Sequence, residues 1–147
     1  MFDVIIVTYN AIDKLRRCIE SVRMHTRDYS LTVVDNHSSD GTRGYLHSLK
    51  AVKVIYNKRN SGFSAAANLG LKSSKGKFIA LLDDDVETES GWLARLYEQM
   101  KDHPKVGIVG CKIVYPDNRI FSAESRVRPM EISGRGEIDK GQRDYVR

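Results

Sequence analysis

Short runs of apolar residues alternate along this chain with segments whose apolar residues recur at helical spacing. The runs that predict strands are Phe2–Thr8, Thr32–Asp35, Val52–Tyr56, Phe78–Asp83 and Val106–Val114. The segments that predict helices are Ile12–His25, Thr42–Leu49, Phe63–Ser73 and Trp92–His103. In the first of these, Leu15, Ile19 and Val22 would share one face of a helix. The strand runs are continuously apolar rather than alternating, which is typical of strands covered on both faces.

The order of these elements predicts the fold class: an α/β fold with a doubly wound, mostly parallel sheet and helices on both faces. After it, Pro116–Asn118 predicts a turn and Ile120–Ala123 a return strand, and the rest is rich in glycine and charge without clear periodicity. We therefore divide the chain into an α/β domain at residues 1–115 and a loop-rich region at residues 116–147. In such a sheet, ligands bind at the carboxyl ends of the strands.

Composition narrows the class of protein. The 147 residues have the length of one domain, and a composition of 41% hydrophobic and 29% charged residues is too apolar for a disordered chain. The apolar runs are far shorter than the roughly 18 residues of a membrane-spanning helix, and Met1–Asp3 lacks a signal peptide's basic residues, so we expect a cytoplasmic protein. Cys18 and Cys111 have neither disulfide-scaffold nor zinc spacing, so both are interpreted as small buried hydrophobic residues.

The net charge of +5 is unevenly distributed. Residues 50–77 contain lysine and arginine but no acidic residue, whereas residues 83–89 contain acidic but no basic residues. One interpretation is two solvated faces; the other is a cationic wall beside a divalent-metal site, which would suit a nucleoside diphosphate. The chain has no basic helix with interleaved aromatic residues, which argues against nucleic acid as the partner.

Three polar clusters directly follow predicted strands, where the fold would place a ligand. They are Thr8–Asn10, Asp35–Thr42 and Asp83–Asp85. Taken singly, Asn10 and Thr42 are explained at least as well as helix N-caps, and Ser39–Gly41 as turn residues. Their coincidence at one edge of the predicted sheet favours a binding site.

The acidic triplet Asp83–Asp85 is the cluster with the most specific chemistry. Three adjacent carboxylates repel one another and are costly to bury unless a cation neutralises them. Carboxylate oxygens suit Mg²⁺ or Mn²⁺, and Mg²⁺ is usually held by one or two protein carboxylates together with substrate phosphates. The alternative is an exposed acidic loop that precedes the next helix and favours its N-terminus.

Other nucleotide and catalytic motifs do not fit the sequence. Gly70–Lys77 resembles a phosphate-binding loop but has the wrong spacing and leads from a helix into a strand. No GxGxxG follows the first strand, and no GxSxG motif or Cys and His pair predicts nucleophilic catalysis. A signalling receiver or a phosphatase usually places a key aspartate after the first or third strand, where this chain has Thr8–Asn10 and Tyr56–Asn57.

Four segments together resemble the family 2 glycosyltransferases, which have the GT-A fold. They are VIIVTYN at Val4–Asn10, VVDNHSSDGT at Val33–Thr42, NSGFSAAANLGL at Asn60–Leu71 and LLDDDVE at Leu81–Glu87. The segment Val106–Ile120 is similar to the one that follows in bacterial members of the rhamnosyltransferase type. The resemblance implies transfer of a sugar from a UDP- or dTDP-type sugar to an acceptor hydroxyl with inversion, in polysaccharide, lipopolysaccharide or cell-wall synthesis.

The resemblance also implies nucleotide-binding roles for individual residues. Thr8, Tyr9 and Asn10 would line the nucleoside pocket. Asp35 would accept a hydrogen bond from the base, which favours uracil or thymine because adenine has no ring N–H to donate. The residues implied to pack under the nucleotide are Asn60, Gly62 and Asn68.

For the diphosphate and the metal, the resemblance points to charged residues. Lys58 or Arg59 would be available to the diphosphate. Asp85 and Asp83 match the metal-binding DxD motif, with Asp85 as the direct ligand of Mn²⁺ or Mg²⁺. Asp83 or Asp84 would then contact the ribose or metal-bound water.

Inversion requires a carboxylate general base to take the proton from the acceptor hydroxyl. The family usually places that base well beyond the DxD motif, which predicts a position beyond Arg147; the candidates within the chain are Glu124, Glu131, Glu137 and Asp139. The implied partners are a nucleoside diphosphate sugar and a saccharide or lipid-linked acceptor, with peripheral contact at the inner face of the membrane. A nucleotide-sugar-binding module without turnover is the alternative.

Overall fold

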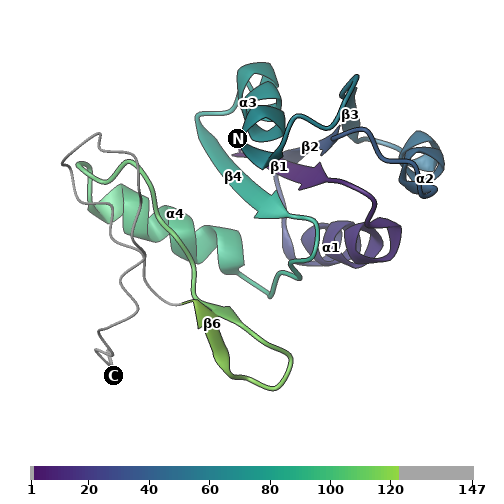
Figure 1. Cartoon of the computed structure of the whole chain (residues 1–147). Helices are drawn as coiled ribbons and strands as arrows, with labels where there is room; N and C mark the ends of the chain where they lie inside the picture. The colour runs from purple at the N-terminus through teal and green to yellow at the C-terminus, as the bar shows by residue number, and fades with distance from the viewer. Residues whose placement is uncertain (1, 123–147) are drawn as a thin grey trace, which may run out of the picture. The chain divides into compact units, whose positions relative to one another are not determined.

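A four-stranded parallel sheet organises the first part of the chain in this computed structural model, which describes residues 2–122 (Figure 1). The strand order is β3-β2-β1-β4. The strands are β1 (Phe2–Thr8), β2 (Tyr29–Asp35), β3 (Lys53–Tyr56) and β4 (Phe78–Asp83). The helices are α1 (Ile12–His25), α2 (Thr42–Ser48), α3 (Phe63–Ser73) and α4 (Trp92–Asp102). This arrangement confirms the predicted α/β class with a parallel sheet.

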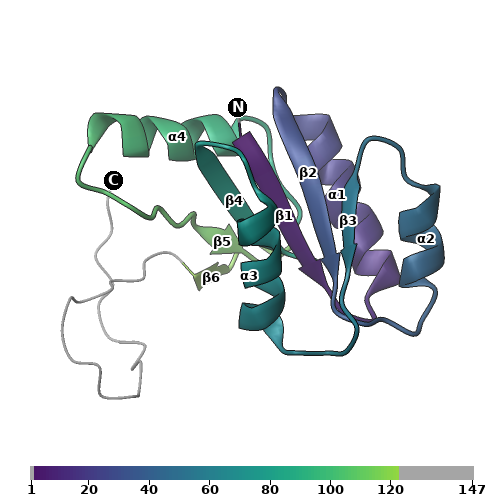
Figure 2. The same ribbon diagram turned by 90° about the horizontal axis from the view of Figure 1, so that it is seen from above.

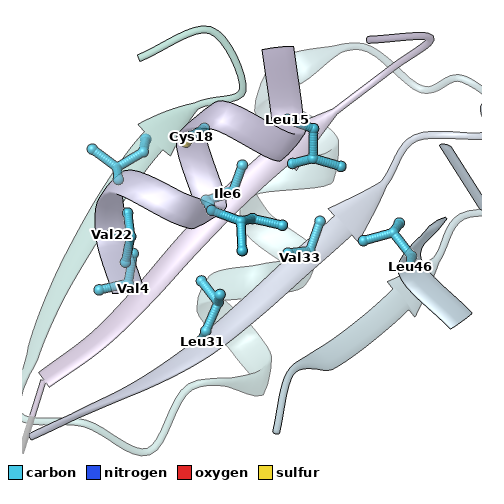
Figure 3. Close-up of a cluster of buried hydrophobic side chains, with 10 residues drawn as sticks. Val4, Ile6, Leu15, Cys18, Val22, Leu31, Val33 and Leu46 are labelled. Carbon is cyan, nitrogen blue, oxygen red and sulfur yellow. The ribbon is translucent and has the colours of Figure 1, made fainter. Parts of the chain in front are cut away.

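Both faces of β1 and β2 are buried, which explains their continuous apolar runs. Val4, Ile6 and Val33 pack with α1 and α2 on one face (Figure 3). On the other face, Ile5 and Val34 pack against α3 (Figure 2). Strand β4 is covered less completely, because Ala80 and Leu82 join the α1 cluster whereas Ile79 and Leu81 are each 41% exposed. The prediction of two covered faces therefore holds for the central strands but not for β4.

Helix α3 lies close to the sheet because Gly70 is at its contact with β1 and β2. A Cβ atom at position 70 would lie 2.6 Å from Ile5 Cγ2 and 3.2 Å from Val34 Cγ2. Glycine in the middle of a helix costs roughly 1 kcal/mol relative to alanine, so packing accounts for its presence here.

The second part of the chain departs from the predicted elements. Of the predicted strand Val106–Val114, only Ile113–Val114 is extended as β5, and it pairs antiparallel with β6 (Ile120–Ser122). The longer strand was wrong because Gly107 and Gly110 interrupt the run, and glycine weakens strands. The turn at Pro116–Asn118 and the return strand are confirmed through Ser122.

The structure separates into two units, Met1–Arg95 and Leu96–Arg147. Helix α4 begins in the first unit and ends in the second. Whether residues 116–147 form a separate functional region stays a prediction. In the described residues, no helix has the length and apolar character needed to span a bilayer.

The two cysteines have different environments. Cys18 is buried under the sheet edge and its thiol lies 3.6 Å from the carbonyl oxygen of Asp83, to which it donates. Burial, with the carboxylates of residues 83–87 as a further cause, raises the pKa of Cys18 to about 12. The prediction of a small buried residue is confirmed for Cys18 and wrong for Cys111, which is exposed.

At the amino edge of the sheet, Asp3 joins three segments of the chain. Its buried carboxylate accepts hydrogen bonds from the Ser30 and Ser74 hydroxyls, from Lys75 N at 2.9 Å and from Gly76 N at 2.8 Å. These bonds, led by the Ser30 hydroxyl, lower the pKa of Asp3 well below its ordinary value. Asp3 therefore connects the starts of β1 and β2 to the turn between α3 and β4.

We expect Asp3→Asn to lower the free energy of unfolding at pH 7 by about 2 kcal/mol, since hydrogen bonds to a charged group are lost. The folded-state pKa lies below the unfolded one, so the stabilisation is complete above the unfolded pKa of roughly 4 and is lost as pH falls below it. Urea unfolding between pH 2.5 and 7 should give a flatter pH dependence for the variant. Asp13→Asn, at an exposed carboxylate, is the control. Parallel profiles for wild type and Asp3→Asn would contradict this role.

Candidate functional site

The carboxyl ends of three strands form a cleft in the first unit. Thr8 is in register with Asp35 across β1 and β2, and Val7 is in register with Asp83 across β1 and β4. The chain winds from β1 toward β3 in one direction and then crosses to β4 on the other side, so the cleft lies at the topological switch point. The cleft has a volume of about 440 Å³ and is lined by Val7, Thr8, Tyr9, Asn36, Asn60, Gly62, Phe63, Asp83, Asp84 and Asp85.

The acidic triplet contributes all three of its residues to the cleft. The Tyr9 backbone amide donates to Asp84 Oδ2 at 3.3 Å, and Lys14 Nζ lies 3.4 Å from Asp85 Oδ2 at the exposed side. Burial raises the pKa of Asp83, and the charges of Asp85 and Asp84 raise it further. Burial also raises the pKa of Asp84, although the Thr8 hydroxyl and the Tyr9 amide partly oppose it. The triplet is therefore a set of crowded carboxylates that a cation would stabilise.

Between residues 2 and 122, no three His, Cys, Asp or Glu side chains are grouped so as to hold a metal ion by themselves. The donors at the cleft are one short run of carboxylates at the end of β4. Their hard oxygen atoms fit Mg²⁺ or Mn²⁺, provided that a ligand such as a diphosphate supplies further oxygens.

Asp35 is fully buried at the end of β2 and does not line the cleft. Its Oδ2 accepts from Arg43 Nε at 2.7 Å and its Oδ1 accepts from Ser38 N at 3.0 Å. The Arg43 side chain also donates to the carbonyl oxygen of Asn57 at 3.2 Å. Asp35 thus connects α2 to the ends of β2 and β3, and its predicted contact with a base stays a prediction.

Two further predicted residues, Asn10 and Asn68, do not line the cleft. Asn10 has a positive φ of 50°. Its side-chain oxygen Oδ1 accepts from Ser39 N at 2.7 Å, and its backbone N–H donates to the Ser38 hydroxyl at 2.9 Å. Asn68 is exposed on α3. The predicted residues that do line the cleft are Thr8, Tyr9, Asn60, Gly62, Asp83, Asp84 and Asp85.

The loop after β2 also organises two helix starts. Asp40 accepts from Thr42 N at 3.1 Å and from Ile12 N at 3.2 Å, the first residues of α2 and α1. The N-cap positions themselves are Ala11 and Gly41, and neither makes a side-chain capping bond. The capping function considered for Asn10 and Thr42 is therefore carried by Asp40.

Three residues of the cleft had no individual role in the prediction: Val7, Phe63 and Asn36, the last of which was predicted only as part of the polar cluster Asp35–Thr42. Asn36 follows Asp35 directly, but the sequence does not reveal which side chain of that pair faces the cleft. Phe63 follows Gly62 at the start of α3, and its ring is 47% exposed. A phenylalanine directly after the glycine of a predicted ligand-binding segment was the available sequence signal for it.

The fold is a doubly wound α/β domain with a cleft at its switch point, where ligands bind in such folds. The family model described as Glycosyl transferase family 2 matches residues 3–144, and the chain therefore belongs to family 2 of the glycosyltransferases. This membership confirms the resemblance drawn from the four sequence segments.

Known relatives and structures agree with that membership. The uncharacterized protein y4gI of Sinorhizobium fredii is 32% identical over 94% of this chain and 16% of its own length. The poly(ribitol-phosphate) beta-N-acetylglucosaminyltransferase TarP of Staphylococcus aureus is 36% identical over 73% of this chain and 35% of its own length. The crystal structure of S. aureus TarS 1-349 in complex with UDP shares the fold, with a TM-score of 0.62 and 20% identity over 80% of this chain and 43% of that one. The chain thus spans less than half the length of each of these proteins.

Proposed function

We propose that the cleft binds the nucleoside diphosphate of a UDP- or dTDP-type sugar, and that the protein contributes the donor site of a glycosyltransferase. The observation that carries this proposal is the convergence of Asp83–Asp85, Tyr9 and the β3–α3 loop (residues 57–62) on one cleft at the carboxyl edge of the sheet. Family membership and the UDP complex of TarS 1-349 support the choice of ligand.

Tyr9 and Phe63 offer the surfaces that a nucleobase or ribose would cover. Their side chains are 48% and 47% exposed, and both line the cleft. Aromatic rings provide apolar area with specific stacking geometry, so covering them with a base would be favourable. Thr8 and Asn60, polar residues that also line the cleft, would fix the orientation of the nucleoside.

The acidic triplet would hold the cation that accompanies the diphosphate. Asp85 would ligate Mn²⁺ or Mg²⁺ directly with Asp83, while Asp84, which already accepts from the Tyr9 amide, would contact the ribose or metal-bound water. When bound, the cation would stabilise the negative charge that develops on the departing diphosphate. Lys14, next to Asp85, and the exposed Lys58 and Arg59 are the cations of the chain proposed to support that charge.

For the transfer itself, we propose in-line displacement with inversion at the sugar carbon, in cell-wall or surface-polysaccharide synthesis. The names of TarP and of the putative teichuronic acid biosynthesis glycosyltransferase TuaG of Bacillus subtilis support that pathway class. The general-base candidates Glu124, Glu131, Glu137 and Asp139 lie outside the described residues. A lipid-linked acceptor and contact with the inner face of the membrane remain predictions, which sedimentation with anionic vesicles at low salt would test.

A thermal-shift panel of UDP, dTDP, GDP and ADP, each with and without Mn²⁺, tests the donor site. A ligand at about 100 times its Kd adds about 2.7 kcal/mol of stability, which raises Tm by several degrees for a domain of this size. We expect Mn²⁺-dependent shifts with UDP or dTDP and smaller ones with GDP and ADP. Equal shifts with all four nucleotides would contradict pyrimidine selection, and no shift with any would contradict the donor site. Binding of a UDP- or dTDP-sugar without release of free sugar or transfer to an added acceptor would favour the module without turnover.

A further inference from the structure

Asn36, at the end of β2, is the centre of a neutral hydrogen-bond network under one wall of the cleft. Its side chain is buried, with 3% of the residue exposed. Its Nδ2 donates to Asn60 Oδ1 at 2.8 Å and to the Gly62 carbonyl oxygen at 3.3 Å. Its Oδ1 accepts from Asn57 Nδ2 at 3.0 Å and from Ser61 N at 3.1 Å. One amide therefore contacts four residues of the β3–α3 loop.

The backbone places this amide against the loop. Asn36 N donates to the carbonyl oxygen of Thr8 at 2.8 Å, and Asn57 N donates to that of Asp35 at 2.8 Å. These bonds extend the ladders of the sheet by one step beyond the strands. Asn36 and Asn57 consequently leave β2 and β3 side by side, with their side chains in contact.

The loop is further closed by its own polar groups. Asn60 Oδ1 also accepts from Gly62 N at 3.0 Å, and Asn57 Nδ2 donates to the Ser61 hydroxyl at 2.7 Å. Gly62 is the N-cap of α3 with a φ of 80°, and no side chain caps that helix start. The position of the start of α3 therefore depends on the network around Asn36.

We propose that Asn36 is a positioning residue: it holds the β3–α3 loop so that Asn60, Gly62 and Phe63 form the wall of the nucleotide cleft. A primary amide has two N–H donors and an oxygen with two lone pairs. Both donors of Asn36 and its oxygen are already used within the chain. Asn36 thus acts on the nucleotide through the loop rather than by a hydrogen bond of its own. This inference rests on the proposed nucleotide site.

A double-mutant cycle with Asn36→Ala and Asn57→Ala tests this role, with Kd for UDP in the presence of Mn²⁺ as the readout. Because both residues act through one loop, each single variant should weaken UDP binding about 10-fold, and the double variant about as much as one single variant. Ser48→Ala, which removes a hydroxyl on α2 that bonds only within its own helix, is the control and should leave Kd unchanged. The Tm of each variant is used to choose a temperature at which all are folded.

Hydrogen exchange of the Ser61 amide, measured without nucleotide, provides the second readout. The wild-type amide is bonded to Asn36 Oδ1, so its protection should fall about 10-fold or more in Asn36→Ala and stay unchanged in Ser48→Ala. Weaker UDP binding with unchanged Ser61 protection, or multiplied losses in the double variant, would overturn the positioning role in favour of direct contact. If the wild type binds no nucleotide, the proposed function fails, whereas the exchange measurement still decides whether Asn36 holds the loop.

Discussion

Asp85→Asn is expected to remove the Mn²⁺-dependent part of UDP binding, raising Kd about 100-fold, or about 2.7 kcal/mol. The substitution keeps the size of the side chain but replaces a charged oxygen donor with a neutral amide. Asp85 lines the cleft, its side chain is 53% exposed, and its ion-pair partner, Lys14 Nζ, lies 3.4 Å from its Oδ2. Such an exposed pair is worth at most about 1 kcal/mol, so Lys14 does not prevent a divalent cation from reaching Asp85. Isothermal titration with UDP, with Mn²⁺ and with EDTA, measures the effect.

Glu87→Gln is a matched control for this prediction. Glu87 also carries an exposed carboxylate, paired with Arg17 at 3.0 Å, but it does not line the cleft. Its substitution should change the Kd for UDP less than about 2-fold, consistent with the small energies of surface ion pairs. An equal loss of UDP affinity in both variants would show that the total negative charge near β4, and not Asp85 itself, supports binding. An unchanged Kd in Asp85→Asn would contradict the assignment of Asp85 as the metal ligand.

Arg43→Met is expected to lower the free energy of unfolding by about 3 kcal/mol, because it leaves a buried carboxylate without its partner. Asp35 is fully buried, and Arg43 Nε lies 2.7 Å from its Oδ2. The Arg43 side chain is 39% exposed, so solvent moderates the loss and keeps it at the lower end of the usual range. Methionine retains much of the apolar stem of arginine but not the guanidinium, which lies 5.5 Å from the centroid of the Tyr56 ring. Chemical unfolding at pH 7 measures the difference.

Two further variants separate charge from packing at this site. Arg17→Met removes an arginine from an exposed pair and should cost less than about 1 kcal/mol. Adding Asp35→Asn to Arg43→Met should recover part of the lost stability, since the buried group is then neutral. If the double variant is less stable than Arg43→Met, the cost lies in the lost hydrogen bonds of Arg43 and not in the unpaired charge.

Much of the fold was predictable because the spacing of apolar residues in β1, α1 and α3 indicates which of their residues are buried. The bounds of Phe2–Thr8, Ile12–His25 and Phe63–Ser73 agree with the predicted ones. The strand predicted at Val106–Val114 failed because Gly107 and Gly110 interrupt the apolar run, and in the described chain only Ile113–Val114 pairs with another strand.

The candidate site was predictable at the level of clusters and less so at the level of side chains. Asp83–Asp85 and Tyr9 lie in the cleft, since both follow strands that end at the same edge. Of the neighbours Asp35 and Asn36, the resemblance drawn from the sequence favoured the Asp35 carboxylate as the residue that contacts the base. The side chains of a strand alternate between faces, and Asp35 pairs with the half-buried Arg43 of α2, so the neighbouring Asn36 lines the cleft. That choice depends on a tertiary ion pair, which no local pattern encodes.

The most direct test of the nucleotide cleft is a titration of the ¹⁵N-labelled protein with UDP and Mg²⁺, followed by backbone amide resonances. We expect the backbone amide resonances of Tyr9, Asn36 and Gly62, at the carboxyl edge of the sheet, to shift progressively with UDP concentration and to saturate. The amides of Lys75 and Gly76, which bond to Asp3 at the amino edge, should not move. Resonance shifts concentrated at the amino edge, or no shifts at the cleft at millimolar UDP, would contradict nucleotide binding in the cleft.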